Sequence, residues 1–250
     1  MKAVILAGGL GTRLAEYTKL IPKPMVRIGK KPILIHIMEI YNRFGVSDFL
    51  ILTGYKSNVI SDYFKDLNYY HKILDKKNEE CFLNTKSKIK ISLIYTGHSS
   101  KTGLRLKKIQ KFFKKDEDFY LTYGDGLANI NLNKLYSYHK SKKSHLTISA
   151  VRPPARFGEV VFKGNKIISF QEKNTINSGW INGGYMVINS IFFEYLSNKN
   201  QMLEREPFNL CLKKQKMHAY KHFGFWQCMD TLRDKEKLEI LSKTNKIPWI

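Results

Sequence analysis

The sequence has few cysteines and no long apolar run, and both absences narrow the class of protein. Three cysteines, Cys81, Cys211 and Cys228, occur among the 250 residues. Because their number is odd and their spacing does not match that of a zinc site, we expect free thiols in a reducing compartment. No stretch approaches the ~20 apolar residues of a membrane-spanning helix, and the first apolar run stops at Gly8, which is too short for a signal peptide. We therefore expect a cytoplasmic protein with no membrane partner.

Acidic residues are also scarce. The chain has 43 lysines and arginines against 21 aspartates and glutamates, which gives a formal net charge of +22. The basic residues are spread along the chain, and the denser groups at 107–115 and 213–216 lie in segments with amphipathic helical spacing. Zinc-finger spacing, aromatic RNA-binding motifs and a basic tail are absent from the sequence, so we expect a solvated basic face and no nucleic-acid partner. The charge would still steer phosphorylated small molecules toward the protein.

Short buried strands alternate with amphipathic helices. Residues 2–6 and 49–53 are apolar strands, and residues 32–44 and 58–67 carry apolar side chains at helical spacing. This order predicts an α/β fold with a mostly parallel sheet flanked by crossover helices. Further strands are expected at 89–95, 119–122, 146–151, 185–188 and 217–222, and further helices at 102–113, 132–140, 192–196, 206–214 and 233–243.

The length predicts one domain over residues 1–250. Two stretches interrupt the alternating pattern. Residues 68–90 are polar and rich in lysine and asparagine, and we interpret them as an insertion that forms a lid or a subunit contact. Residues 160–170 predict a small β insertion, a hairpin that turns at Gly164-Asn165.

The loop after the first strand combines glycines with two cations. Gly8, Gly9 and Gly11 allow a tight turn whose backbone N–H groups can hold an anion. Arg13 can grip a phosphate with two hydrogen bonds, and Lys23 lies between two prolines that restrict its backbone. The spacing matches neither the dinucleotide fingerprint nor a Walker A loop. A plain tight turn is the alternative, but the two cations favour a site for a polyphosphate.

Two aspartates are candidates for a metal site. Asp125 follows the expected strand at 119–122 and lies between two glycines, at the edge where ligands bind in open α/β sheets. A carboxylate there can hold Mg²⁺ against phosphate oxygens, although a simple Gly-Asp-Gly turn would have the same sequence. Asp230 has its own alternative as the N-cap of the last helix, since Thr231 follows it.

Two further groups could contact a ligand. Ser100, Thr102, Gly103 and Arg105 occupy a loop-to-helix junction that suits a phosphate or a nucleotide edge, or simply caps the helix. Glu172 and Lys173 end one strand and Asn182-Gly183-Gly184 begins another, which together offer a carboxylate, an amide and exposed backbone to sugar hydroxyls. An exposed charged pair and a turn would explain the second group equally well on local grounds.

The motifs, taken together, resemble the sugar-1-phosphate nucleotidylyltransferases. The resemblance begins at Gly8–Leu14 with Pro22–Met25, and the matches appear in order over nearly the whole chain. The later segments resemble the members of that family that use CTP and glucose 1-phosphate: Tyr123–Gly126, Phe170–Lys173, Trp180–Gly184 and Gly224–Lys235. The resemblance implies the Rossmann-like, mostly parallel mixed sheet of the nucleotide-diphospho-sugar transferases.

The resemblance also implies roles for individual residues. Arg13 and Lys23 match the catalytic cations, and Asp125 and Asp230 match a pair that holds Mg²⁺. The positions that match nucleotide contacts are Leu6, Ala7, Gly8, Gly9, Leu10, Gly11, Thr12, Arg13, Lys23, Ser100, Arg105 and Gly124. The positions that match sugar contacts are Glu172, Lys173, Asn182 and Gly183.

The implied reaction joins CTP and α-D-glucose 1-phosphate to give CDP-glucose and pyrophosphate. By the same resemblance, CDP-glucose feeds dideoxyhexose synthesis for a surface polysaccharide such as the O-antigen of lipopolysaccharide, and the chain forms a homo-oligomer. One position departs from the family pattern Glu-Lys-Pro, because Asn174 replaces the proline, which leaves the choice of sugar open.

Three alternatives stay open. The first is the same reaction with dTTP or UTP, or with a modified sugar 1-phosphate. The second is a basic nucleic-acid-binding protein, which predicts DNA affinity that falls steeply with salt and does not need Arg13 or Lys23. The third, a regulator that binds sugar nucleotides without catalysis, is disfavoured because both cations and both aspartates are present.

Overall fold

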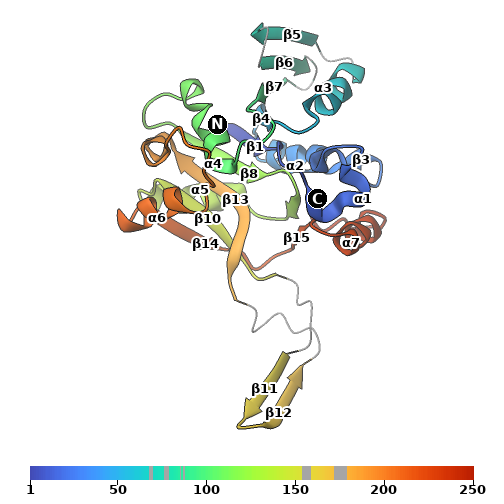
Figure 1. The fold of residues 1–250 in the computed structure, drawn as a ribbon, viewed down its shortest axis with the longest axis vertical. Coiled ribbons are helices and arrows are strands. Elements are labelled where there is room, and N and C mark those ends of the chain that lie inside the picture. The colour runs from blue at the N-terminus through green and yellow to red at the C-terminus, as the bar shows by residue number, and fades with distance from the viewer. Residues whose placement is uncertain (68–69, 76–78, 85, 87, 154–158, 172–178) are drawn as a thin grey trace.

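The computed structural model describes residues 1–67, 70–75, 79–84, 86, 88–153, 159–171 and 179–250. Nine of its strands are β1 (Lys2–Leu6), β4 (Asp48–Thr53), β5 (Tyr70–Asp75), β6 (Glu79–Asn84), β7 (Ile89–Tyr95), β8 (Asp118–Tyr123), β10 (Leu146–Val151), β13 (Ile181–Asn189) and β14 (Met217–Lys221). They form one sheet in the order β14-β10-β13-β8-β1-β4-β7-β6-β5 (Figure 1).

The sheet is mixed, with a parallel centre. β1 pairs in parallel with β4 and β8, β4 pairs in parallel with β7, and β10 pairs in parallel with β14. β13 runs antiparallel between β8 and β10, and β5 and β6 extend the sheet antiparallel beyond β7. The predicted mostly parallel α/β sheet is therefore confirmed. The central strands are continuous apolar runs, as strands covered on both faces must be.

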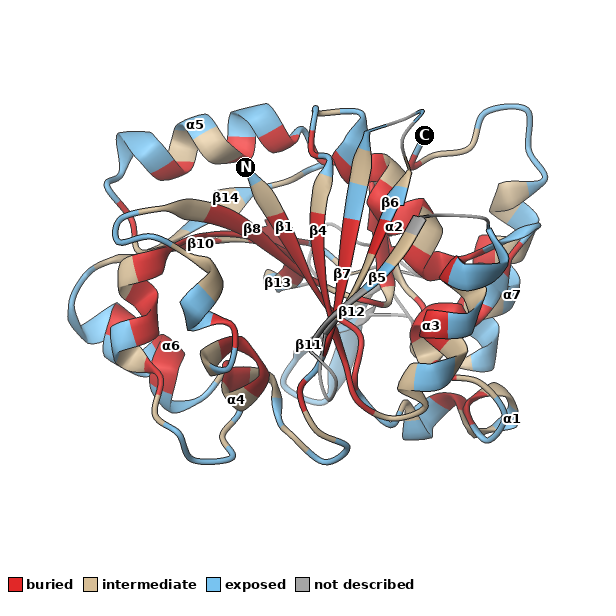
Figure 2. Ribbon diagram, turned by 90° about the horizontal axis from the view of Figure 1, so that it is seen from above, coloured by how far each residue is buried: buried red, intermediate tan, exposed pale blue. Residues whose placement is uncertain are grey.

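Helices cover both faces of the sheet. On one face lie α2 (Ile33–Asn42), α3 (Ser57–Asp66), α5 (Leu132–Ser141) and α7 (Leu232–Ser242), and on the other lie α4 (Thr102–Lys107), α6 (Glu206–Lys213) and the 3-10 helix η4 (Ser190–Tyr195). Ala3 and Ile5 of β1 pack into the apolar core on the side of α2, α3, α5 and α7. Val4 and Leu6 pack into the apolar core on the side of α4, α6 and η4. Successive residues point to opposite faces of a strand, so this one strand contributes to both cores. The ribbon of β1 is coloured mostly as buried in Figure 2.

Two predicted helices are shorter or tighter than expected. The helix predicted over 102–113 ends at Lys107, and a separate 3-10 turn, η3 (Gln110–Phe112), follows it. The helix predicted over 192–196 is the 3-10 helix η4. Apolar spacing does not separate the two kinds of helix over one or two turns, because both bring residues three apart onto the same side.

The predicted insertion over 68–90 contains two described strands, β5 and β6. β6 pairs with β7, and its Phe82 is buried against Phe64 of α3, with ring centroids 5.7 Å apart. The segment therefore extends the central sheet at one edge. Its proposed role as a lid or a subunit contact stays a prediction, as does the division of the chain into one domain.

Three small sheets complete the fold. The predicted hairpin consists of β11 (Glu159–Lys163) and β12 (Lys166–Gln171) and projects away from the main sheet in Figure 1. A second pair joins β2 (Arg27–Ile28) to β3 (Lys31–Pro32). The third pair, β9 (Gly126–Ala128) with β15 (Trp226–Cys228), escaped the sequence analysis because a strand of three residues shows no alternation.

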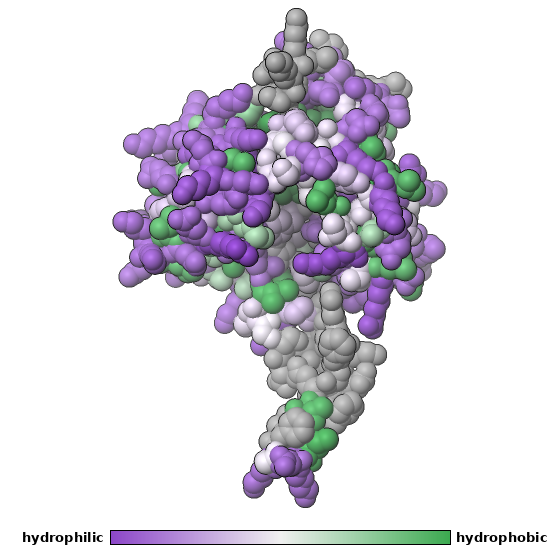
Figure 3. All heavy atoms as spheres, viewed as in Figure 1, coloured by the Kyte–Doolittle hydropathy of each residue, from purple (hydrophilic) through white to green (hydrophobic). Residues whose placement is uncertain are grey.

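The helices of the described residues include none that is long and apolar enough to cross a membrane. Hydrophilic side chains cover most of the face shown in Figure 3, and hydrophobic ones are scattered over the main body and also present on the projecting hairpin. Ile167 and Ile168 of β12 are 56% and 57% exposed.

Candidate active site

A cavity of about 1760 Å³ opens at the carboxyl ends of β1 and β8. This is the edge at which open α/β sheets bind ligands. Of the predicted site residues, the cavity is lined by Leu6, Ala7, Gly8, Gly9, Gly11, Thr12, Arg13, Lys23, Ser100, Arg105, Gly124, Asp125, Asn182, Gly183 and Asp230. Leu10 does not line it and is 47% exposed. The predicted sugar contacts Glu172 and Lys173, and Asn174 beside them, lie outside the described residues.

The glycine-rich loop is tied to its neighbours through its backbone. The carbonyl of Gly8 accepts a hydrogen bond from the N–H of Tyr55 at 3.3 Å, and the carbonyl of Gly11 accepts one from the hydroxyl of Thr18 at 3.0 Å. The loop continues into the 3-10 helix η1 (Thr12–Leu14) and the short helix α1 (Ala15–Thr18). These contacts hold the loop in place before any ligand arrives.

Arg105 is a buried cation beneath this loop. Its guanidinium donates to the carbonyl of Thr53 at 2.9 Å, the hydroxyl of Thr96 at 2.6 Å and the carbonyl of Gly8 at 2.7 Å. The residue is only 3% exposed, and burial lowers the pKa of its guanidinium. A methyl group added at Gly8 would lie 2.2 Å from Arg105 Nη1, so the guanidinium can reach the loop only because residue 8 has no side chain.

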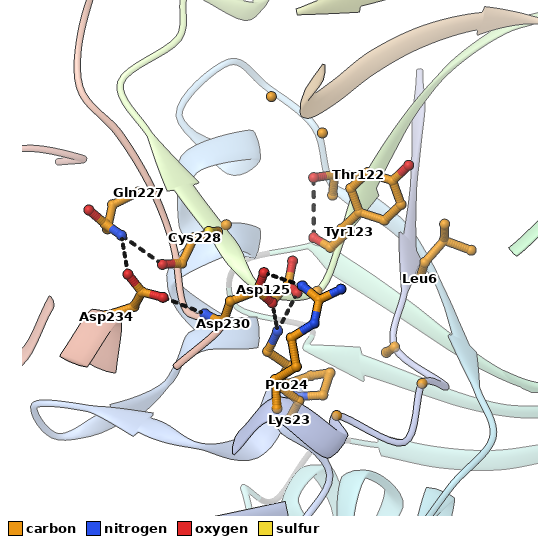
Figure 4. Close-up of a pocket in the computed structure, with 18 of the residues that line it drawn as sticks. Leu6, Lys23, Pro24, Thr122, Tyr123, Asp125, Gln227, Cys228, Asp230 and Asp234 are labelled. Carbon is orange, nitrogen blue, oxygen red and sulfur yellow. Dashed lines mark hydrogen bonds and ion pairs between the residues drawn. The ribbon is translucent and has the colours of Figure 1, made fainter. Parts of the chain in front are cut away.

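Lys23 lies at the centre of a charged cluster (Figure 4). It comes from the 3-10 helix η2 (Lys23–Met25), and its Nζ is 2.7 Å from Asp125 Oδ2 and 2.6 Å from Asp230 Oδ1. Arg13 Nη1 is 2.8 Å from the other carboxylate oxygen of Asp230. The Lys23 side chain is 12% exposed, whereas that of Arg13 is 76% exposed and extends into the cavity mouth.

The cluster shifts the pKa values of Lys23 and Asp230. Burial by itself would lower the pKa of Lys23, but the charges and hydrogen bonds of Asp125 and Asp230 raise it above its ordinary value. Burial by itself would raise the pKa of Asp230, but Lys23 and Arg13 hold it below its ordinary value. Both shifts favour the charged forms of Lys23 and Asp230, so the ion pair between these two residues is charged at neutral pH.

A short strand pair brings the two aspartates together. Asp125 precedes β9 and Asp230 follows β15, and these strands pair antiparallel with Gly126 opposite Cys228. The N–H of Met229 also donates to the carbonyl of Asp125 at 2.8 Å. Residues separated by more than a hundred positions thus share one site because of a contact that only the tertiary structure makes.

Asp230 is not the N-cap of α7. Thr231 holds that position, and its hydroxyl accepts a hydrogen bond from the N–H of Asp234 in a capping box. The Asp234 carboxylate in return accepts the N–H of Thr231 at 2.9 Å. With the helix capped by its neighbours, the Asp230 carboxylate is free to face the cavity.

The pair of aspartates suits a magnesium ion. Their carboxylates already converge on one cation, the ammonium of Lys23. Among the residues that the structure describes, no group of three or more His, Cys, Asp and Glu side chains is placed to hold a metal by itself. Mg²⁺ commonly binds through one or two carboxylates together with substrate phosphates and water, and the two converging carboxylates of Asp125 and Asp230 match that requirement.

The opposite wall is built from β8 and β13. Asn182 Oδ1 accepts a hydrogen bond from the N–H of Gly184 at 2.9 Å, and Trp226 Nε1 donates to the carbonyl of Gly183 at 2.7 Å. Gly184 has φ +81°, and a methyl group there would lie 2.7 Å from the ring of Tyr123. This glycine therefore lets the Tyr123 ring lie against β13.

Two residues at or behind this wall, Tyr123 and Glu204, were not among the predicted site residues. Tyr123 lines the cavity, and its hydroxyl donates to the carboxylate of Glu204. Tyr123 could have been suspected, since it directly precedes Gly124 and Asp125 at a strand end. Glu204 has no sequence signal, because it lies in an irregular segment whose neighbours in space come from β8 and α4.

Comparisons with known proteins agree with this geometry. The sequence profile of the family described as nucleotidyl transferase matches residues 2–230. The glucose-1-phosphate cytidylyltransferase of Salmonella typhimurium is 43% identical over 255 aligned residues, which cover 100% of this chain and 98% of the relative. A probable glucose-1-phosphate cytidylyltransferase of Bacillus subtilis is 41% identical over 94% of this chain and 93% of its own.

A solved structure is similar over the same extent. HddC from Yersinia pseudotuberculosis, in complex with GMP-PN, superposes with a TM-score of 0.71 at 25% identity, covering 97% of this chain and 99% of its own.

Proposed function

We propose that this chain, which belongs to the nucleotidyl transferase family, transfers a cytidylyl group from CTP to α-D-glucose 1-phosphate and releases pyrophosphate. The choice of substrates is supported by the relatives of 41% and 43% identity, which carry the name glucose-1-phosphate cytidylyltransferase. The observation that carries the chemistry is the cluster of Lys23, Asp125 and Asp230 beside the glycine-rich loop.

In the proposed reaction an oxygen of the sugar phosphate attacks the α-phosphorus of CTP, and the bond to pyrophosphate breaks. The attacking group is already an anion, so no covalent enzyme intermediate and no base are needed. The protein has to hold two anions in line and neutralise them. Lys23 would contact the α-phosphate or the sugar phosphate, and Arg13, which reaches into the cavity mouth, would stabilise the departing pyrophosphate.

We propose Mg²⁺ as the metal, held by Asp125 and Asp230. When bound there, it would supply the positive charge of a Lewis acid to the phosphates of the substrates. The chain's own part is to present the two carboxylates beside a fixed pair of short strands. Lys23 and Arg13 also favour the ionised form of Asp230.

The glycine-rich loop would hold the triphosphate, with the predicted contacts from Leu6 to Arg13 and with Ser100 and Gly124 on the facing elements. Arg105 supports this proposal in a second way, because it fixes the Gly8 carbonyl from below. Asn182 and Gly183 would contact the sugar from β13. Glu172 and Lys173 stay predicted sugar contacts on the strength of the family pattern.

We further propose a homo-oligomer, a location in the cytoplasm and a place in dideoxyhexose synthesis for surface polysaccharide. The exposed Ile167 and Ile168 on the projecting hairpin support a contact with a second copy. The three cysteines form no disulfide, which suits a reducing compartment. Light scattering on the purified protein tests the first point, since a monomer at micromolar concentration would refute it.

The test of the proposed function is pyrophosphate release with glucose 1-phosphate and Mg²⁺, offering CTP, UTP, dTTP, ATP and GTP in separate reactions. We expect CTP to be preferred by at least about tenfold, and the product to have the mass of CDP-glucose. Preference for dTTP or UTP would keep the reaction and correct the nucleotide. No release in any reaction, together with salt-dependent binding to DNA, would favour a nucleic-acid-binding protein.

A further inference from the structure

The carboxylate of Glu204 joins two walls of the cavity. One oxygen accepts a hydrogen bond from the hydroxyl of Tyr123, at the end of β8. The other accepts one at 2.9 Å from the hydroxyl of Thr102, the first residue of α4. The Thr102 hydroxyl in turn accepts the N–H of Leu203 at 2.8 Å. Tyr123 and Thr102 both line the cavity, whereas Glu204 lies behind them and does not.

This arrangement fixes which way the Tyr123 hydroxyl points. A tyrosine hydroxyl has one proton to donate and lone pairs to accept with. Because the proton is directed at Glu204, the oxygen presents only lone pairs to other groups. Asn182 already uses one of them, as its Nδ2 lies 3.5 Å away in donor geometry.

The Asn182 amide is oriented by a second contact. Its Oδ1 accepts the N–H of Gly184 at 2.9 Å, which leaves the NH2 group toward Tyr123. The wall therefore offers a hydroxyl oxygen that can only accept beside the NH2 group of an amide, which donates. A sugar hydroxyl, which both donates and accepts, is complementary to such a pair.

We propose that Glu204 is a positioning residue for the sugar 1-phosphate, which sets the Tyr123 hydroxyl as an acceptor for one hydroxyl of the sugar ring. The proposal rests on the proposed function, in that it assigns the β8–β13 wall to the sugar. Tyr123 would touch the sugar itself, while Glu204 acts only through Tyr123.

A carboxylate is needed at residue 204 because it must accept on both sides. In Glu204→Gln, the amide oxygen can accept from Tyr123 or from Thr102, but the NH2 group has to face the other hydroxyl. If the NH2 group faces Thr102, the Thr102 hydroxyl has to turn its proton away from residue 204 while it goes on accepting from Leu203. If the NH2 group faces Tyr123 instead, the Tyr123 hydroxyl becomes the acceptor of that bond and turns its proton toward the cavity.

The experiment is a double-mutant cycle with Glu204→Gln and Tyr123→Phe. The wild-type protein is first assayed with several sugar 1-phosphates and nucleotides, and the best pair is used throughout. An error in the proposed substrates is then detected in the wild-type protein, before the role of Glu204 is tested. We expect each single variant to raise KM for the sugar phosphate about tenfold, with KM for the nucleotide within about twofold.

The decisive result is the behaviour of the double variant. If Glu204 acts through Tyr123, the double variant has the same KM for the sugar phosphate as Tyr123→Phe alone, because no hydroxyl is left to orient. Multiplied effects, or an equal rise in KM for the nucleotide, would overturn the proposal and indicate a general structural role. Glu194→Gln, which removes a carboxylate at an exposed position, is the matched control and should leave both KM values unchanged.

Discussion

The ammonium nitrogen of Lys23 lies 2.7 Å from a carboxylate oxygen of Asp125, a residue 102 positions further along the chain. The same nitrogen is 2.6 Å from Asp230. A single cation thus holds together the two side chains that are proposed to bind the metal, and it does so from a segment restricted by prolines on both sides.

Replacing Lys23 should abolish most of the activity. Lys23→Ala removes the charge proposed to act on the transferred phosphate, and loss of one such group commonly costs about 10²–10³ in kcat. Steady-state pyrophosphate release measures the effect. Lys30→Ala, which removes a lysine at an exposed position of the adjoining turn, is the control and should retain wild-type kcat. Turnover by Lys23→Ala at the wild-type rate would refute the role of Lys23.

The same variant should respond more strongly to Mg²⁺. Without Lys23, the carboxylates of Asp125 and Asp230 face each other with no cation between them, which disfavours the ionised pair. A divalent ion then relieves this repulsion and stabilises the folded protein by mass action. We expect Mg²⁺ to raise Tm more in Lys23→Ala than in the wild-type protein, measured by calorimetry without substrate. An equal or smaller rise would argue against metal binding by these two aspartates.

Gly8 and Gly9 should differ sharply in their tolerance of a methyl group. In Gly8→Ala the added carbon would lie 2.2 Å from the buried Arg105 guanidinium, whereas at Gly9 nothing lies within 4 Å. Gly8→Ala must therefore displace Arg105 from its carbonyl acceptors, and we expect a loss of about 1–3 kcal/mol in the free energy of unfolding.

Urea unfolding of both variants tests this difference. Gly9→Ala should keep the wild-type stability to within about 0.5 kcal/mol. If Gly8→Ala were as stable as Gly9→Ala, the Arg105 guanidinium could not lie against residue 8 as it does in the structure.

Asp118 should make the protein sensitive to acid. Burial alone would raise the pKa of this carboxyl, but the nearby His139 and the hydrogen bonds from Asn189 and Lys140 hold it well below its ordinary value. A depressed pKa in the folded state contributes stability above the pKa of the unfolded carboxyl, about 3.9, and this contribution is lost as the pH falls through the folded value. Asp118→Asn should therefore cost about 1.5–3 kcal/mol at pH 7.

The difference between Asp118→Asn and the wild-type protein should shrink as the pH falls below about 3.9. Urea titrations at pH 7 and pH 3 measure it. Asp62→Asn, at a side chain that is 62% exposed, is the control and should change stability by less than about 0.5 kcal/mol at either pH. A difference between Asp118→Asn and the wild-type protein that does not depend on pH would contradict the assignment.

Trp226 should matter for the sugar phosphate more than for the nucleotide. Its indole N–H donates to the carbonyl of Gly183 and fixes the backbone beside Asn182. Trp226→Phe keeps a ring but loses this donor, so we expect KM for glucose 1-phosphate to rise about fivefold with little change in KM for CTP. A larger effect on CTP would place the nucleotide, not the sugar, against β13.

Local patterns were enough to predict most of the main sheet and its helices. The central strands are apolar runs bounded by glycines or polar residues. A continuous apolar run of this length indicates a strand that is buried on both faces of a sheet. The short strands β9 and β15 and the edge strands β5 and β6 were missed because their stabilising partners are distant in sequence. A strand of three residues is too short to show an alternation of apolar and polar residues, and a polar edge strand has the composition of a loop.

The sequence by itself determined the α/β fold class, because strand and helix patterns alternate along the chain. It also determined the candidate phosphate loop with Arg13 and Lys23, because glycine, arginine and lysine indicate phosphate binding by their residue type alone. Only the tertiary structure placed Asp125 and Asp230 on one ammonium, and capped α7 with Thr231 so that Asp230 faces the cavity. It alone placed Glu204 behind Tyr123. These are contacts across the sheet edge, and their geometry depends on how strands pair, which no local pattern encodes.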